Sequence, residues 1–249
     1  MNNKKLSIII PAYDEELSIW LTIGTFVTEL NIYHIDYEII VINDNSKDQT
    51  YDIVNQISKT NNFVKVINND MWQNWFGMAI RCWLKYFDGD YVAIVMADLS
   101  DMPIDVINMY LIAVNSGYDA VFGSRFIKWW WTHDYPLPKY ILNRITNWII
   151  MALFLIKYND ITNACKLYSK QTIAWLQPIL SKHFNLTVEL PLKTIIRWYK
   201  YTYIPNQRYN RKQWISKLKI QEMWSRYFFI IMYCWFENLL SRWDYKKLP

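Results

Sequence analysis

Short apolar segments alternate with amphipathic ones through the first half of the chain, and this order limits the possible folds more than any other feature. Runs rich in Ile and Val predict strands at residues 6–10, 37–42, 63–67 and 119–122, and in the run that starts at residue 91. The segments between them predict helices at residues 14–30, 51–58, 77–87 and 103–116. Strands and helices in this order form a parallel, doubly wound sheet with right-handed crossovers. The sequence therefore predicts an α/β fold with helices on both faces of the sheet.

The apolar run that starts at residue 91 breaks abruptly into two carboxylates, Asp98 and Asp101, with Ser100 between them and Pro103 after them. Because proline cannot continue a central strand, the carboxylates lie at the carboxyl end of this strand, where open α/β sheets bind ligands. Carboxylates held there can bind a divalent cation, and the cation can bind phosphate oxygens. The alternative is a solvated turn in which Asp98 or Asp101 caps the next helix.

A second polar loop, residues 43–50, follows the strand predicted at residues 37–42. Parallel strands end at the same edge of a sheet, so Asp44 in this loop is expected on the same rim as Asp98. Asp48, in the same loop, is more typical of a helix cap than of a ligand.

The length of 249 residues suits one large or two small domains. Hydrophobic residues make up 53% of the chain, which excludes a disordered protein. The chain has 14 Trp and 19 Tyr but only 5 Gly, and such aromatic rings suit surfaces that meet both apolar and aqueous surroundings, including membrane interfaces.

The three cysteines, Cys82, Cys165 and Cys234, lie far apart, which favours a reduced compartment over a disulfide framework or a zinc site. The polar start of the chain shows no secretory signal.

The net charge of +5 is unevenly spread along the chain. Residues 191–249 contain twelve Lys and Arg against three Asp and Glu, so the rest of the chain is net acidic. A basic end indicates an anionic partner, which could be lipid headgroups, a phosphate substrate or nucleic acid. Because no nucleic-acid-binding motif accompanies these residues, nucleic acid is not expected.

Two further segments, residues 140–157 and 227–240, predict strongly apolar helices. Their uncharged runs fall short of the roughly 20 residues that span a bilayer, so no transmembrane helix is predicted.

Residues 212–243 alternate cationic and aromatic side chains. This pattern indicates either a helix packed on the preceding domain or peripheral attachment to an anionic leaflet, and we favour attachment. Residues 126–138 are expected to form a loop, whose three tryptophans at 129–131 would be a lid over the site or would dip into a membrane.

Several segments resemble, in the same order, the motifs of inverting family 2 glycosyltransferases. Pro-Ala-Tyr-Asp-Glu-Glu at residues 11–16 resembles their Pro-Ala-Tyr-Asn-Glu-Glu opening, residues 41–50 resemble their nucleotide-binding loop, and Met-Ala-Asp at residues 96–98 resembles their Asp-x-Asp motif. Three more resemble the polyprenol-phosphate sugar synthases, the branch typified by dolichol-phosphate mannose synthase. They are Gly-Ser-Arg-Phe at 123–126, Asp-Ile-Thr-Asn-Ala-Cys-Lys at 160–166 and Arg-Lys-Gln-Trp-Ile-Ser-Lys at 211–217.

The resemblance implies a GT-A fold that transfers a sugar from a nucleotide sugar with inversion. The catalytic domain would span residues 1–219, followed by a basic, aromatic, amphipathic helix at 220–249. A divalent cation, Mg²⁺ or Mn²⁺, would be held at the donor diphosphate by Asp98 with Ser100. The residues expected to bind the nucleotide are Pro11, Tyr13, Glu15, Asp44, Gly77 and Arg81. The residues expected to face an acceptor phosphate are Arg125, Arg144, Lys166, Arg211 and Lys217.

The sequence departs from the family pattern at several positions. Met96 replaces the first aspartate of the Asp-x-Asp motif, for which Asp101 or Ser100 would compensate. Other residues stand where the family has glycine: Asn45, Gln49, Trp75, Trp83, Ala164, Trp198 and Trp214. Bulky residues tolerate positive φ poorly, so either these turns are rebuilt or the backbone never required that conformation.

The acceptor decides whether the reaction needs a general base. A sugar hydroxyl must lose a proton, usually to a carboxylate, whereas a polyprenyl phosphate is already anionic and needs positioning by cations. Residues 185–192 offer one acid, Glu189, at a helix start without a second acid beside it, which favours the lipid phosphate. Glu189 either acts at the site or interacts with the helix dipole. The predicted catalytic residues are Asp98, Asp101 and Glu189.

The leading hypothesis is a cytoplasmic glycosyltransferase, peripheral on a membrane, that moves a hexose from a nucleotide sugar to a polyprenyl phosphate. One alternative is an enzyme of the same fold that extends a saccharide, with Glu189 or Asp101 as base. The other is a catalytically silent relative that binds lipid or a protein partner.

Overall fold

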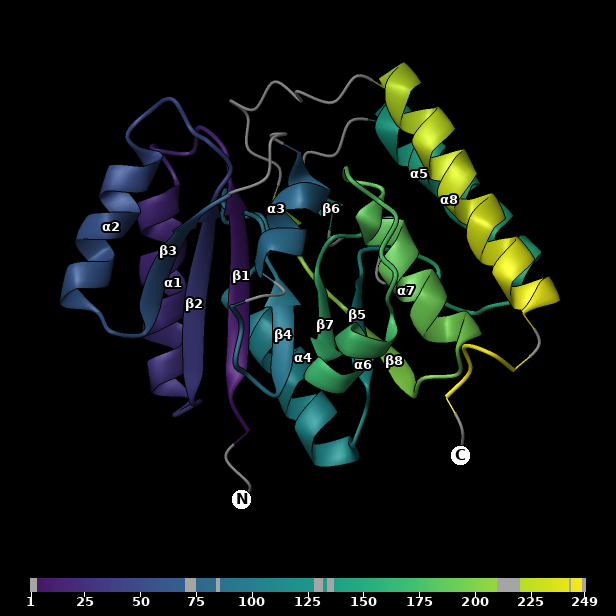
Figure 1. Cartoon of the computed structure of the whole chain (residues 1–249), viewed down its shortest axis with the longest axis horizontal. Coiled ribbons are helices and arrows are strands. Elements are labelled where there is room, and N and C mark those ends of the chain that lie inside the picture. Colours follow the sequence, from purple (N-terminus) through teal and green to yellow (C-terminus); the bar gives the residue numbers. More distant parts are fainter. Residues whose placement is uncertain are drawn as a thin grey trace.

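A seven-stranded sheet forms the centre of the computed structural model (Figure 1), with the strand order β3-β2-β1-β4-β7-β5-β8. The described residues are 4–69, 75–83, 86–127, 132–133, 137–209, 220–241 and 243–247. The strands of this sheet are β1 (Leu6–Ala12), β2 (Tyr37–Asn43), β3 (Val64–Asn68), β4 (Tyr91–Ile94), β5 (Ala120–Ser124), β7 (Lys166–Ser169) and β8 (Tyr201–Pro205). All neighbouring pairs are parallel except those that β7 makes with β4 and β5. A second small sheet pairs β6 (Thr132–His133) with β9 (Arg208–Tyr209).

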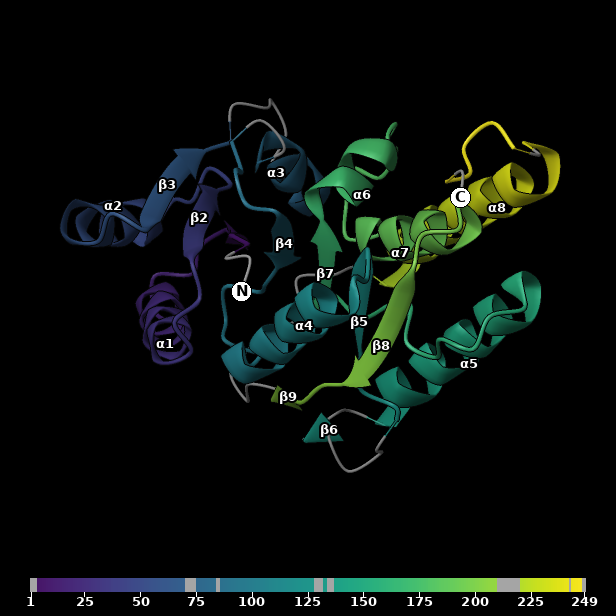
Figure 2. The same cartoon turned by 90° about the horizontal axis from the view of Figure 1, so that it is seen from below.

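Helices cover both faces of the large sheet. They are α1 (Ile19–Ile32), α2 (Thr50–Thr60), α3 (Phe76–Trp83), α4 (Pro103–Ser116), α5 (Leu137–Phe154), α6 (Lys170–Trp175), α7 (Leu186–Ile196) and α8 (Ile220–Leu240). Figure 2 shows α1 and α4 on one side of the sheet and α3, α6 and α7 on the other, with α5 beyond β8. The predicted α/β fold with helices on both faces is therefore confirmed.

Alternating side chains of the central strands form two separate cores, as the period of two in a strand requires. On β1, Ile8 and Ile10 pack with the helices α1 and α4, whereas Ile9 packs on the opposite face with α3, α7 and α8. Both sets of side chains are inaccessible to solvent. A strand buried on both faces explains why β1 and β2 are almost continuously apolar in sequence.

Two predicted boundaries near the amino terminus were wrong. The first strand continues through Pro11 to Ala12. Proline is tolerated there because β4 pairs with β1 only as far as Ile9, so no strand on that side needs a hydrogen bond from the nitrogen of Pro11. The first helix begins at Ile19 and not at residue 14. The backbone amides of Glu15 and Glu16 instead bind side chains of the loop after β2, so these residues form a turn.

Several elements in the second half of the chain were not predicted. They are β7, α6 and β8, together with the short strands β6, which lies in the segment expected to be a loop, and β9. The helix start expected at residues 185–192 is confirmed, because α7 begins at Leu186. β7 and β8 have only four and five residues, too few for a periodic pattern to stand out. α8 begins seven residues before the helix predicted at 227–240.

α8 packs on the rest of the protein by one face. Ile230, Ile231 and Cys234 belong to the core formed with α3, α5, α6 and α7. Figures 1 and 2 show α8 and α5 at the end of the molecule opposite to α2. Among the helices that the structure describes, none is long and apolar enough to cross a membrane.

Candidate active site

The carboxyl ends of three neighbouring parallel strands, β1, β2 and β4, meet at one edge of the sheet. The registers pair Ala12 with Asn43 and Ile9 with Ile94. Asp44 directly follows β2, and Asp98 lies four residues beyond the end of β4. The prediction that these two carboxylates share a rim of the sheet is therefore confirmed.

A residue other than glycine has positive φ shortly after each of these three strands. Asp14 follows β1 with φ of 52°, Asn45 follows β2 with 59°, and Leu99 follows β4 with 55°. Such backbone conformations cost energy in residues with a side chain, and they concentrate at functional sites. Their occurrence on three adjacent loops marks this edge as the candidate active site.

The positions that depart from the family glycines differ in their backbone conformation, and Trp214 among them lies outside the described residues. Asn45 and Trp198 keep positive φ, at 59° and 64°. Asn tolerates this region because its short side chain can hydrogen-bond locally, whereas Trp198 lies just after the end of α7, packed edge-on against Trp243 with 5.0 Å between ring centroids. Gln49 has φ of −80°, so the backbone at that position does not require glycine.

The loops after β1 and β2 are tied together by side chains bound to backbone amides. Asp14 Oδ1 accepts from the Lys47 amide at 2.7 Å, and the Glu15 amide donates to Thr50 Oγ1 at 2.8 Å. Asp48 Oδ2 accepts from the Glu16 amide at 3.0 Å. These contacts hold the candidate nucleotide-binding residues Pro11, Tyr13 and Glu15 in one rigid rim.

Asp48 has a structural role, as its position before a helix indicated. Its Oδ1 accepts from both the amide and the hydroxyl of Thr50, at 3.0 and 2.5 Å. Burial would raise the pKa of Asp48, but the hydrogen bonds from Thr50 and from the Glu16 amide outweigh burial, so the pKa lies below its ordinary value.

Asp44 is buried at the rim, and its side chain has a defined partner. Asn69 Nδ2 donates to Asp44 Oδ1 at 2.6 Å, and the Asn69 amide donates to the Asn43 carbonyl at 2.9 Å. Burial raises the pKa of Asp44 above its ordinary value, with the Asn69 hydrogen bond opposing. An oriented carboxylate of this kind can accept from an N–H group of a nucleotide base.

The loop after β4 holds the candidate metal ligands. Asp98 Oδ1 accepts from the Ser100 amide at 3.0 Å, and Asp101 Oδ2 accepts from the Met96 amide at 3.1 Å. The hydroxyl of Ser100 is buried and has no hydrogen-bond partner among the described residues. Asp101 thus supports the backbone of the residue that replaces the first motif aspartate.

These residues fit a cation that takes most of its ligands from the substrate. Among the described residues, no three His, Cys, Asp or Glu side chains come together as a preformed metal site. Mg²⁺ and similar ions commonly use one or two protein ligands together with substrate phosphates and water. Asp98 and the unsatisfied hydroxyl of Ser100 suit that arrangement.

Gly77 and Arg81, both on α3, show packing contacts in the structure. A Cβ at Gly77 would lie 2.6 Å from the carbonyl carbon of Lys182, so this position needs glycine for close packing against the segment before α7. Arg81 Nη1 lies 4.0 Å from Met78 Sδ. Nucleotide binding by these two residues stays a prediction.

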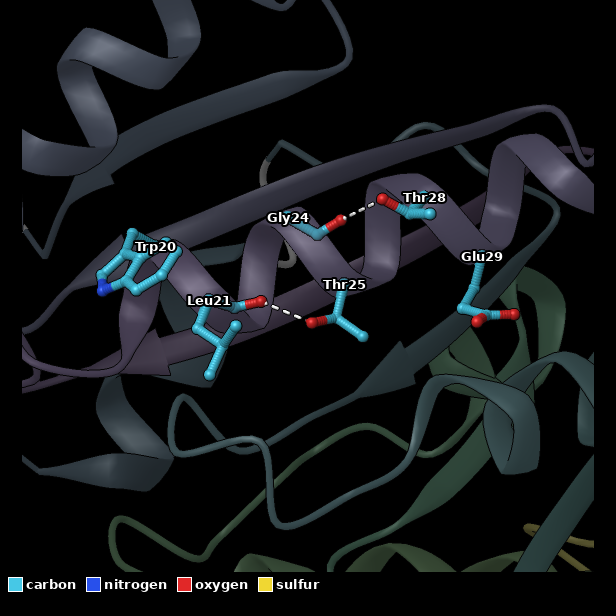
Figure 3. A pocket seen from close by; sticks show the side chains of 6 residues that line it. All are labelled: Trp20, Leu21, Gly24, Thr25, Thr28 and Glu29. Carbon is cyan, nitrogen blue, oxygen red and sulfur yellow. Dashed lines mark hydrogen bonds between the residues drawn. The ribbon is translucent and has the colours of Figure 1, made fainter.

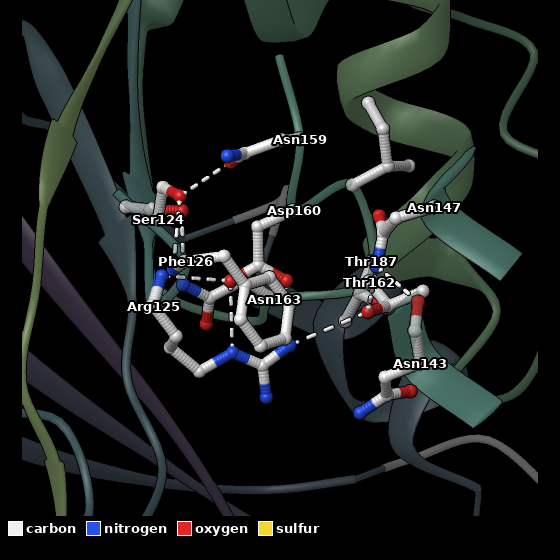
Figure 4. Close-up of polar contacts among 12 residues, drawn as sticks. Ser124, Arg125, Phe126, Asn143, Asn147, Asn159, Asp160, Thr162, Asn163 and Thr187 are labelled. Atoms are coloured by element: carbon white, nitrogen blue, oxygen red, sulfur yellow. Dashed lines mark hydrogen bonds and ion pairs between the residues drawn. The ribbon is translucent and has the colours of Figure 1, made fainter. Parts of the chain in front are cut away.

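Arg125 is held rigidly at the end of β5 (Figure 4). Its Nε and Nη2 donate to the two carboxylate oxygens of Asp160 at 2.8 and 2.6 Å, and its backbone amide donates to Asp160 Oδ2 at 2.9 Å. Both residues are buried, so this paired, planar contact fixes the plane of the guanidinium group.

Arg144, on α5, lies next to the same site. The guanidinium carbons of Arg125 and Arg144 lie 5.2 and 4.7 Å from the centroid of the Phe126 ring. Nη1 of Arg144 is buried and has no hydrogen-bond partner among the described residues. Since a buried guanidinium N–H without a partner is costly, this atom is a strong candidate to bind an anion.

Lys166 and Glu189 are occupied by contacts within the protein. Lys166 Nζ donates to the carbonyls of Ile161, Asn163 and Thr187, and burial lowers its pKa to about 7. Glu189 accepts from the amides of Leu180 and Ser181 at 2.8 and 2.7 Å. Lys193 Nζ donates to the same carboxylate at 2.7 Å.

These contacts assign structural roles to both residues, and the site roles predicted for them gain no support from the geometry. The other predicted acceptor residues, Arg211 and Lys217, and the tryptophans at 129–131 lie outside the described residues.

A shallow hollow lies elsewhere, on the exposed face of α1 (Figure 3). Its lining is formed by Trp20, Leu21, Gly24, Thr25, Thr28 and Glu29. None of these side chains belongs to the rim, so the hollow has no part in the candidate active site.

The sequence did not predict that Asp160, Thr162 and Asn147 lie near Arg125. Asp160 is predicted only as part of a motif, without a role of its own. Thr162 accepts hydrogen bonds from both Arg125 and Asn147, and neither Thr162 nor Asn147 is predicted as a site residue. A polar Asn in the middle of a strongly apolar helix was the signal that could have identified Asn147.

Comparison with curated proteins finds glycosyltransferases of similar sequence. Among curated proteins, an uncharacterized glycosyltransferase of Synechocystis is 33% identical over 123 residues, which are 49% of this chain and 37% of that protein. The dolichol-phosphate mannosyltransferase of Pyrococcus furiosus is 29% identical over 140 residues, 56% of this chain and 38% of that protein. The matched segments thus span less than two fifths of these relatives.

Solved structures share the fold. Glucosyl-3-phosphoglycerate synthase from Mycobacterium tuberculosis, in complex with uridine diphosphate, superposes with a TM-score of 0.68 at 15% identity, covering 93% of this chain and 80% of that one. The same enzyme with Mn²⁺, uridine diphosphate and glucosyl-3-phosphoglycerate gives a TM-score of 0.66 at 16% identity, covering 97% and 80%. The family model described as glycosyl transferase family 2 matches residues 7–174. This chain therefore belongs to glycosyl transferase family 2.

Proposed function

We propose that the protein transfers a hexose from a nucleoside-diphosphate sugar to a polyprenyl phosphate on the cytoplasmic surface of a membrane. The observation that carries this proposal is the placement of Arg125 and Arg144 against the Phe126 ring, with Nη1 of Arg144 buried and without a hydrogen-bond partner among the described residues. Two guanidinium groups beside one ring offer N–H donors to a phosphate, which accepts several charge-assisted hydrogen bonds.

The donor half of the proposal rests on the rim of the sheet. Pro11, Tyr13 and Glu15 would contact the nucleotide, and Asp44 would accept from its base. Asp98 and Ser100 would hold a divalent cation, which would neutralise the charge that develops on the departing diphosphate. The complex of the mycobacterial neighbour with Mn²⁺ and uridine diphosphate supports this assignment by analogy.

In the proposed reaction an oxygen of the acceptor phosphate forms a bond to the anomeric carbon of the sugar. The bond from that carbon to the diphosphate oxygen breaks, and its electron pair leaves with the nucleoside diphosphate. No proton needs to be removed, because the attacking oxygen is already anionic. The full occupation of Glu189 by two amides and Lys193 supports an acceptor that needs no base.

Membrane attachment is proposed from the outer faces of α5 and α8. α5 exposes the apolar side chains Leu137, Ile141, Ile145, Trp148 and Ile149, and α8 exposes Phe228, Phe229, Phe236, Leu239 and Leu240. On α8 the opposite face is buried against the protein, so packing on the preceding domain leaves the exposed face available for the proposed attachment. Exposed apolar helix faces suit a lipid surface, and α8 lies within the basic end of the chain, which suits an anionic one.

A donor and acceptor screen tests the proposed reaction. The protein is incubated with radiolabelled UDP- and GDP-hexoses, Mn²⁺ or Mg²⁺, and one of three acceptors: undecaprenyl phosphate in vesicles, water-soluble farnesyl phosphate, or 3-phosphoglycerate. The proposal expects label in the lipid extract, lost when EDTA is added. Label on 3-phosphoglycerate alone would keep a phosphate acceptor but reject the lipid. In a fourth incubation with oligosaccharides as acceptor, label there and on none of the three phosphates would favour the saccharide-extending alternative.

Arg144→Ala tests the acceptor site directly, because Nη1 of Arg144 has no hydrogen-bond partner among the described residues. Calorimetric binding of farnesyl phosphate should weaken by about 10- to 100-fold, since hydrogen bonds between charged groups are lost. Lys59→Ala removes an exposed cation at the far end of α2 and should leave binding unchanged. Equal binding by wild type and Arg144→Ala would reject the acceptor site.

Vesicle binding tests the proposed attachment. The double variant Ile149→Asp and Phe228→Asp should reduce co-sedimentation with anionic vesicles, because both side chains are more than half exposed on α5 and α8. Ile32→Asp is the matched control, since Ile32 is equally exposed but lies on α1. If both proteins bind vesicles like the wild type, attachment by these helices is wrong.

A further inference from the structure

One buried polar side chain connects α5 to the Arg125 site. Asn147 is inaccessible to solvent, although its helix is largely apolar. Its Nδ2 donates to the carbonyl of Asn143, one turn earlier, at 2.8 Å and to Thr162 Oγ1 at 3.3 Å. Because the Asn143 carbonyl can only accept, it sets the orientation of the Asn147 amide and turns Nδ2 toward Thr162.

Thr162 is in turn bound to Arg125. Its Oγ1 accepts from Arg125 Nη2 at 3.3 Å, the same nitrogen that donates to Asp160 at 2.6 Å. Figure 4 shows this hydroxyl between the guanidinium group of Arg125 and the helix that carries Asn147. One oxygen therefore receives a hydrogen bond from α5 and another from the guanidinium group.

Over residues 144–149, α5 carries a buried polar residue, an exposed apolar face and Arg144. Asn147 lies on the buried face, and Ile145 and Ile149 lie on the exposed apolar face. Arg144 extends from the same turn to the Phe126 ring. A small shift of α5 would therefore move Arg144 relative to Arg125, which is anchored on the sheet through β5 and Asp160.

We infer that Asn147 and Thr162 are positioning residues that fix the separation of Arg125 and Arg144 for a phosphate group. This inference rests on the proposed acceptor site. The two residues contact neither the phosphate nor the reacting atoms in this scheme. They join the helix that carries one arginine to the loop that orients the other, and a phosphate bound between the arginines requires both at once.

Thr162→Val and Thr162→Ser form the central test, because they keep the shape or the hydroxyl respectively. The probe is farnesyl phosphate, and its dissociation constant is measured by calorimetry in Mn²⁺ and UDP. Thr162→Val should weaken binding by about 3- to 10-fold, the range for one or two modest hydrogen bonds, and Thr162→Ser should restore it. The dissociation constant for UDP with Mn²⁺ should stay unchanged in both variants.

Thr146→Val is the matched control on α5. Thr146 is the neighbour of Asn147, but its hydroxyl donates to the Leu142 carbonyl within the helix at 2.9 Å. This variant should bind farnesyl phosphate like the wild type. Asn147→Ala should weaken binding as Thr162→Val does, and the double variant should be no weaker than either single one, because both break the same connection.

The outcomes separate this inference from the proposed function. If Arg144→Ala weakens farnesyl phosphate binding and Thr162→Val does not, the acceptor site stands and the positioning role is wrong. If Thr162→Val weakens UDP binding equally, or Thr162→Ser fails to restore acceptor binding, its effect is one of general stability and the inference is overturned. If neither Arg144→Ala nor Thr162→Val changes binding, the proposed acceptor site itself fails.

Discussion

Arg197 and Glu237 form a buried ion pair that ties α7 to α8. Arg197 Nε donates to Glu237 Oε1 at 2.7 Å and Nη2 donates to Oε2 at 3.1 Å. The remaining nitrogen, Nη1, donates to the carbonyls of Trp175 and Gln177 at 2.7 and 3.1 Å. This geometry makes α8 part of the same folded unit as α7, since both charges are compensated only when α8 is docked.

Glu237→Gln should therefore destabilise the protein. The substitution leaves the buried Arg197 without a counter-charge, and breaking one side of a buried ion pair costs about 3–5 kcal/mol. The free energy of unfolding, measured by urea denaturation at pH 7, should fall by this order. Asp244→Asn, at an exposed position shortly after α8, should change stability by less than about 0.5 kcal/mol. Equal midpoints for wild type and Glu237→Gln would contradict the prediction.

Asp105 predicts a specific dependence of stability on pH. Burial raises the pKa of its carboxyl to about 6, opposed by the hydrogen bond from the Gln207 amide at 2.8 Å and assisted by the charge of Asp101. The unfolded chain releases this proton near pH 4. The folded protein therefore binds this proton more tightly than the unfolded chain does. The stabilisation that proton binding gives the folded state is fully present below about pH 4 and is lost as pH rises through about 6.

Asp105→Asn should remove that contribution and keep an oxygen that can accept from Gln207. The free energy of unfolding at pH 7 should rise relative to wild type by roughly 1–3 kcal/mol, while the two proteins converge near pH 4. Urea denaturation in EDTA at several pH values measures the difference. A variant that differs from wild type by the same amount at every pH would show that Asp105 does not titrate as described.

Asp98→Asn should remove activity without unfolding the protein. The amide keeps an oxygen for the Ser100 N–H but loses the charge that a divalent cation requires. Turnover of the donor found in the screen should fall more than about 100-fold, and Mn²⁺-dependent binding of UDP should weaken. Asp52→Asn, an exposed change on α2, is the control. Full activity of Asp98→Asn would reject the proposed cation site.

Two glycines should respond in opposite directions to alanine. At Gly77 the new Cβ would lie 2.6 Å from a backbone carbon of Lys182, so Gly77→Ala should cost roughly 1–3 kcal/mol by overpacking. At Gly24, in the exposed part of α1, a Cβ would meet nothing within 4 Å, so Gly24→Ala should stabilise by about 0.5–1 kcal/mol. Thermal denaturation checks both, and equal shifts would contradict the packing described.

The first half of the fold could be predicted because its signals are local. Strands such as β1 and β2 are continuous apolar runs buried on both faces, and the loops after them carry polar residues. The common rim of Asp44 and Asp98 followed from the rule that parallel strands end at one edge. The start of the first helix was predicted wrongly. The backbone amides of Glu15 and Glu16 donate to side chains of the loop after β2, so these residues form a turn before the helix and not its first turn.

The sequence by itself determined the α/β class, the carboxylates at the sheet edge and the family motifs, because these depend on periodicity and on residue type along the chain. Tertiary structure alone decided which charged groups are available for chemistry. Lys166 and Glu189 resemble site residues in sequence, yet their charges are balanced by backbone groups and by Lys193. Arg125 and Arg144 come to lie beside one ring, Phe126, only through folding, because burial forces each charged or polar group to find partners that are distant along the chain.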